Sequence, residues 1–106
     1  MQIAPTMPVA QVFTTAASYA ETARTQATAL SIVMLDHAVR FTRKAIELSS
    51  SVPNGGPATD QLFSGLELLK TARNSETAAR TPHLIDARDA LRIARDTLLA
   101  AAAAAR

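Results

Sequence analysis

The stretch SSSVPNGGPATD, residues 49–60, is the strongest interruption in a chain whose other segments have helical periodicity. Two prolines around a central Asn-Gly-Gly cannot continue a helix, so the sequence predicts a surface loop at which the chain reverses. Thr59 or Asp60 is the expected cap of the helix that follows. The helices on the two sides of this loop are therefore expected to pack antiparallel.

Before the loop, residues 9–51 repeat apolar or small side chains at steps of three and four, the spacing of a helix seam. A second apolar stripe predicts that residues 30–48 pack on two sides. The earlier part has one thin Ala stripe and five threonines, which are middling helix formers, so we expect a separate, weaker helix there, with a break near residues 22–28. The seam is Phe13, Ala16, Ala20, Ala23, Ala27, Leu30, Met34, Ala38, Phe41, Ala45 and Leu48, and the second stripe is Ile32, Leu35, Val39 and Ile46.

After the loop, two further segments carry the same rhythm, residues 61–79 and a last helix that Thr81-Pro82 is expected to start. Gly65 costs about 1 kcal/mol inside a helix, and its presence indicates a close helix crossing. Residues 1–8 contain two prolines and no periodicity, which predicts a flexible N-terminal tail. The predicted fold is all-α, a single domain over residues 9–106 built as an antiparallel helical hairpin or bundle of three to four helices.

The composition excludes several classes of function. The chain has 106 residues, a formal charge of +2, no Cys and two His, so thiolate chemistry is absent. Neither His has a spaced acidic partner, most carboxylates have Arg or Lys at helical spacing, and no phosphate loop occurs, so we expect no metal site, no cofactor and no enzyme activity. Neither a signal peptide nor a membrane-spanning segment is expected, which favours the cytoplasm.

His37 is the first candidate for chemistry, with Asp36 before it and Arg40 three residues later. This arrangement resembles histidine phosphotransfer domains, helical bundles of similar size in which Lys stands three residues after the His and Gly follows. Arg40 and Phe41 occupy those positions in this chain. The resemblance implies a phosphotransfer module with His37 as acceptor and Arg40 as electrostatic support; the alternative is that His37 is a polar residue at the edge of an amphipathic helix.

The second candidate is a ridge of Arg88, Arg92 and Arg95 on the last helix, which could meet phosphates or an acidic partner. Asp89 and Asp96 stand three or four positions from Arg92, so a salt-bridged solvent face is the competing interpretation. Because stacking aromatics are missing and the net charge is small, nucleic acid is not the expected partner. The alternative that the ridge leaves open is a weak binder of anions or nucleic acid.

The third hypothesis is a protein–protein interaction module, an adaptor, export chaperone or self-assembling subunit. The first helix has only a narrow apolar stripe, so it is the segment least expected to be stable without a partner. This stripe is the predicted partner-binding surface: Phe13, Ala16, Ala20, Ala23, Ala27 and Leu30. Residues 32–48, IVMLDHAVRFTRKAIEL, are similar to the first conserved helix of flagellin export chaperones in their Met-Leu, Arg-Phe and Ala-Ile. That resemblance, over less than a fifth of the chain, implies export-chaperone activity.

Overall fold

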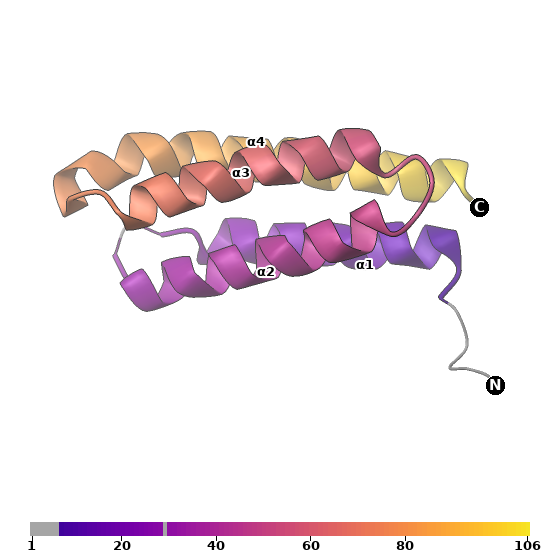
Figure 1. Cartoon of the computed structure of the whole chain (residues 1–106), viewed down its shortest axis with the longest axis horizontal. Coiled ribbons are helices and arrows are strands. Elements are labelled where there is room, and N and C mark those ends of the chain that lie inside the picture. Colours follow the sequence, from indigo (N-terminus) through magenta and orange to yellow (C-terminus); the bar gives the residue numbers. More distant parts are fainter. Residues whose placement is uncertain (1–6, 29) are drawn as a thin grey trace.

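The computed structural model describes residues 7–28 and 30–106, and these form four helices. The helices are α1 (Val9–Gln26), α2 (Ile32–Ser50), α3 (Gly56–Arg73) and α4 (Thr77–Ala104). Successive helices run in opposite directions, and each packs against two neighbours: α1 and α3 each lie between α2 and α4 (Figure 1). The prediction of an all-α antiparallel bundle is confirmed, with four helices in the described chain.

The core consists mainly of Ala and Leu side chains, together with Phe13 and Val12. Small side chains let the helix axes approach closely. At Gly65 of α3, an added Cβ would lie 3.1 Å from Cδ2 of Leu91 in α4. The close crossing predicted from this glycine is therefore confirmed.

The break between the first two helices lies slightly later than predicted, because α1 continues to Gln26 and α2 begins at Ile32. Ser31 caps α2, and its hydroxyl accepts a hydrogen bond from the Met34 backbone N–H at 3.3 Å.

The buried side of α2 differs from the predicted seam, since it contains Thr42 and Ser49. Each hydroxyl donates to a carbonyl of its own helix, Thr42 to Ala38 at 2.8 Å and Ser49 to Ile46 at 3.3 Å, which allows burial without an unpaired group.

The loop between α2 and α3 is shorter than the predicted residues 49–60. The first turn of α3 already contains Gly56 and Pro57, since Pro needs no N–H there. The expected caps Thr59 and Asp60 are therefore inside the helix, and Gly55 is the N-cap. Asn54 turns the chain with a φ of 69°, a left-handed conformation that Asn tolerates. The Ser49 and Thr59 hydroxyls, 2.7 Å apart, join the two helix ends across this loop.

The prediction that Thr81-Pro82 starts the last helix was wrong. The N-cap of α4 is Glu76, and Pro82 lies inside the helix. Proline removes one backbone hydrogen bond to the carbonyl four residues earlier, which belongs to Ala78. Ala78 is exposed, so water can satisfy that carbonyl and the helix continues through the proline.

Of the predicted N-terminal tail, residues 1–6 lie outside the described residues, and Met7 and Pro8 lead directly into α1. None of the four helices combines the length and the apolar character that crossing a membrane requires, as far as the described chain extends.

Candidate functional site

A continuous chain of ion pairs runs along the side of the bundle where α1 and α4 meet. Arg24 donates two hydrogen bonds to Glu21, at 2.9 and 2.6 Å, and Arg95 of α4 reaches the same carboxylate at 2.7 Å. The chain continues from Arg95 to Asp96 at 3.0 Å, from Asp96 to Arg92 at 3.8 Å, and from Arg92 to Asp89 at 2.6 Å. Three cations and three carboxylates alternate, so the network has no net charge.

Glu21 is the centre of this network. The hydrogen bonds from Arg24, opposed by partial burial and helped by Arg95, lower the pKa of Glu21 from 4.5 to about 2. Hydrogen bonding to Glu21 in turn raises the pKa of Arg24 and, together with Asp96, that of Arg95. Glu21 therefore stays ionised well below neutral pH, and its carboxylate joins α1 to α4 through Arg95.

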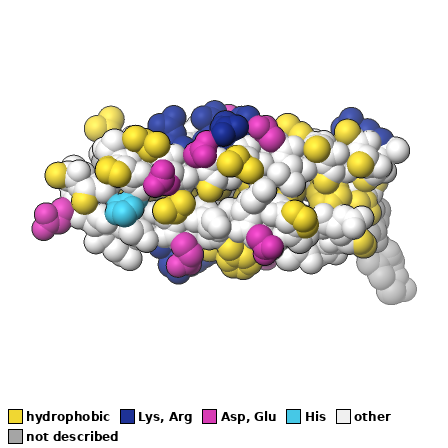
Figure 2. All heavy atoms as spheres, turned by 90° about the horizontal axis from the view of Figure 1, so that it is seen from above, with side chains coloured by type: hydrophobic (Ala, Val, Ile, Leu, Met, Phe, Trp, Pro, Cys, Tyr) yellow, Lys and Arg dark blue, Asp and Glu magenta, His cyan; other side chains and the backbone are white. Residues whose placement is uncertain are grey.

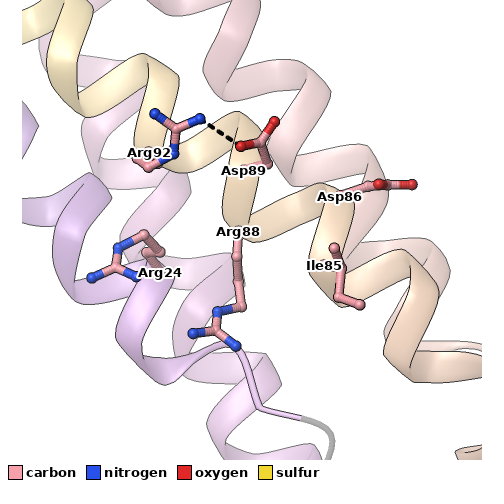
Figure 3. Close-up of a pocket in the computed structure, with 6 residues that line it drawn as sticks. All are labelled: Arg24, Ile85, Asp86, Arg88, Asp89 and Arg92. Atoms are coloured by element: carbon pink, nitrogen blue, oxygen red, sulfur yellow. Dashed lines mark hydrogen bonds and ion pairs between the residues drawn. The ribbon is translucent and has the colours of Figure 1, made fainter.

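Two surface hollows lie along the network, and an exposed apolar side chain lines each. The first, of about 350 Å³, lies beside Ile85, which is 60% exposed. Figure 3 shows Arg24 reaching it from α1 and the other side chains from α4, with Arg92 directed to Asp89. Its lining is Arg24, Ile85, Asp86, Arg88, Asp89 and Arg92.

The second hollow, of about 280 Å³, lies beside Leu99, which is 46% exposed. Thr14, Ala17 and Ser18 of α1 form its other side, and Glu21 and Arg95 of the ion-pair network also line it. We call this side the α1–α4 face, made of both hollows and the ion pairs along them: Thr14, Ala17, Ser18, Glu21, Arg24, Ile85, Asp86, Arg88, Asp89, Arg92, Arg95, Asp96 and Leu99.

The arginine ridge predicted from the sequence lies on this face, but most of its charge is neutralised. The pairs of Arg92 with Asp89 and Asp96 are confirmed, and Arg95 is shared by Glu21 and Asp96. Among the described residues only Arg88 of the three has no ion pair. In Figure 2 basic, acidic and apolar side chains are intermixed over α3 and α4, without a broad basic surface in that view. This pattern favours the salt-bridged face over the nucleic-acid interpretation.

The predicted partner-binding seam is mostly in the protein's own core. Phe13, Ala16, Ala20, Ala23 and Ala27 are at most 2% exposed, because α1 packs between α2 and α4. This corrects the prediction that α1 presents these side chains to another chain. Leu30 alone of the six is outside, 95% exposed in the turn before α2.

His37 and Arg40 lie on α2, away from the α1–α4 face. His37 is half-buried and Arg40 is exposed, while Asp36 is engaged with Arg73 of α3 at 2.8 Å. Phe41 stacks on Tyr19 of α1, with 6.0 Å between ring centroids. The phosphotransfer hypothesis stays a prediction.

Sequence reasoning missed Glu21, Arg24, Ile85 and Leu99, because the contact between α1 and α4 joins residues more than 70 positions apart. Across residues 7–28 and 30–106, no group of three His, Asp or Glu side chains could hold a metal ion.

Comparison with family models, with curated proteins and with solved structures gives no match for this chain.

Proposed function

We propose that this protein is a non-catalytic helical module that binds another protein chain through the α1–α4 face. The observation that carries the proposal is the exposure of Ile85 and Leu99, each beside a hollow, at the two ends of an ordered ion-pair network. Apolar side chains next to ordered arginines are typical of the centre of protein interfaces.

The chemistry of the face favours a protein partner over other ligands. Its hollows are open and shallow, which suits the side chains of a partner better than an enclosed small molecule. Its ion pairs balance, so a polyanion such as nucleic acid would have to compete with Glu21, Asp89 and Asp96 for the arginines. A protein surface can instead offer both apolar and charged groups.

Photo-crosslinking in the native cells tests this proposal. A benzophenone amino acid is placed at Ile85 or Leu99, and at Phe63 of α3 as the matched control, since Phe63 is 48% exposed and lies off the face. We expect a discrete protein adduct from the first two positions and none from Phe63. The absence of adducts at Ile85 and Leu99, or the same adducts from all three positions, would refute it.

A further inference from the structure

The hollow beside Ile85 contains arginine N–H groups that the ion-pair network leaves unused. Arg24 donates to Glu21 through Nε and Nη2, and its Nη1 makes no hydrogen bond within the part of the chain that the structure describes. Arg88 forms no ion pair there either. Both arginines line the hollow, so their remaining donors are available to a ligand that enters it.

Arg88 is also the lining cation whose charge no described carboxylate balances. The other two arginines of the hollow, Arg24 and Arg92, each bind a carboxylate of the network at 2.6 Å. Asp86 lines the hollow as well, but Figure 3 shows its side chain directed away from Arg88, which extends from α4 towards α1. Among the described residues, the side of the hollow next to α1 therefore has one positive charge without a partner.

We infer that the hollow beside Ile85 receives an acidic side chain of the partner protein, an Asp or Glu that stands next to a large apolar side chain. This inference rests on the proposed function and states the chemistry of the partner. The carboxylate accepts hydrogen bonds from Arg88 and from Nη1 of Arg24. The apolar side chain packs on Ile85, which is 60% exposed and loses this contact with water on binding.

A single carboxylate matches the unused groups in both charge and geometry. A planar guanidinium can donate to both oxygens of one carboxylate, and Arg88 has all of its five N–H groups to offer. One carboxylate balances the one unpaired positive charge. A phosphate group carries a charge of about −1.5 to −2, so part of it would stay unbalanced close to Asp89, which lines the same hollow.

The existing ion pairs prepare the hollow for this ligand. Glu21 holds Arg24 through two hydrogen bonds, so little freedom of that side chain is left to lose on binding. Arg92 holds Asp89 at 2.6 Å, which weakens the repulsion between Asp89 and an incoming carboxylate. Ordered arginine beside an exposed apolar side chain is the combination that contributes most at the centre of protein interfaces.

Selection from a phage-displayed library of random peptides gives the first arm of the test. The library is depleted on the Ile85→Ser chain and then selected on the wild-type chain, so that the retained peptides require Ile85. We expect these peptides to be enriched in Asp or Glu next to Leu, Ile or Phe, relative to the starting library. Because Ile85 is largely exposed, the substitution should leave the fold intact, which circular dichroism checks.

The second arm measures the affinity of the most enriched peptide by fluorescence anisotropy. Arg88→Gln removes the unpaired charge and is expected to weaken binding about fivefold. Arg43→Gln, the same substitution at an exposed residue of α2, is the matched control and should bind as the wild type does. Replacing the peptide's acidic residue by its amide should weaken binding to the wild type equally and abolish the effect of Arg88→Gln. If Ile85→Ser does not fold, peptides are selected without depletion and this comparison decides.

The inference is overturned if the retained peptides are not enriched in Asp or Glu, or if no peptide is retained. Equal affinities of the Arg88→Gln and Arg43→Gln chains for the selected peptide overturn it as well. Neutral or basic peptides combined with protein adducts from Ile85 in cells would remove this inference and leave the proposed function standing. The absence of adducts from both Ile85 and Leu99 would remove the proposed function too.

Discussion

Nη1 of Arg95 lies 2.7 Å from Oε1 of Glu21, and this contact joins α4 to α1 across 74 positions of the chain. Both side chains are partly shielded from solvent, with 27% and 37% of their surface exposed. The pair is therefore screened less than the pairs of Arg92 with Asp89 and Asp96 within α4, which are about half exposed. It joins the two helices that form the α1–α4 face.

A double-mutant cycle on this pair should give a favourable coupling of about 1 kcal/mol, the upper end for partly exposed ion pairs. The variants are Glu21→Gln, Arg95→Gln and their combination, and urea unfolding measures the free energy. Asp89 and Arg92, which pair within α4 and are about half exposed, are the control, with an expected coupling of a few tenths of a kcal/mol. Equal coupling energies in the two cycles would contradict the proposal that Glu21 stabilises the contact between α1 and α4.

The lowered pKa of Glu21 predicts a specific acid sensitivity. Because its pKa falls from 4.5 in the unfolded chain to about 2 in the fold, its stabilising contribution is complete above pH 4.5 and disappears as the pH falls towards 2. The difference in unfolding free energy between wild type and Glu21→Gln should therefore shrink by about 1 kcal/mol over this range, a value reduced for solvent screening. Glu47→Gln, the same substitution at an exposed residue of α2, is the matched control.

Gly65→Ala should destabilise the fold by about 1 kcal/mol although Ala is the better helix former. The new Cβ would lie 3.1 Å from Cδ2 and 3.2 Å from Cγ of Leu91, which is fully buried and cannot easily move. Overpacking of about 1–3 kcal/mol exceeds the propensity gain of about 1 kcal/mol. Gly56→Ala, where an added Cβ meets nothing within 4 Å, should stay within about 0.5 kcal/mol of wild type. Thermal unfolding of both variants measures the difference, and a more stable Gly65→Ala protein would contradict the tight crossing.

Gly55→Ala should be the most damaging of the glycine substitutions, with a loss of about 3 kcal/mol or more. An added Cβ would lie 1.8 Å from the carbonyl oxygen of Ser49, a backbone atom that cannot rotate away. The conflict is one of space, since Gly55 has an ordinary φ of −82°. Chemical denaturation of the variant checks this, and near wild-type stability would mean that the loop can rearrange without cost.

The helices could be predicted because their signals are local. The three-four spacing, the Pro-Asn-Gly-Gly-Pro interruption and the pairs of Arg92 with Asp89 and Asp96 all depend on neighbours within a few residues. The predicted helix boundaries were less accurate where two local signals compete. Pro82 is an example: proline favours the first turn of a helix, but here it lies inside α4.

The candidate site could not be predicted, because it depends on which helix covers the seam of α1. The spacing of Ala16, Ala20 and Ala23 is the same whether the covering helix belongs to this chain or to another, so periodicity alone cannot separate core from interface. Once α4 covers this seam, the Ala side chains are buried, and Glu21 and Arg24 on the adjacent stripe become the groups that meet Arg95 and line the hollows.

The reassignment of the α1 seam from partner surface to core leads to a last prediction, on Ala20 and Leu30. Ala20 is fully buried, so Ala20→Leu should force the helices apart and cost about 1–3 kcal/mol of stability. Leu30 is 95% exposed, so Leu30→Ser should change stability by less than about 0.5 kcal/mol. Urea unfolding of both variants at one concentration makes the comparison. If Ala20→Leu were as stable as wild type, the seam would have free space beside it, and the original prediction of a partner bound along α1 would regain support.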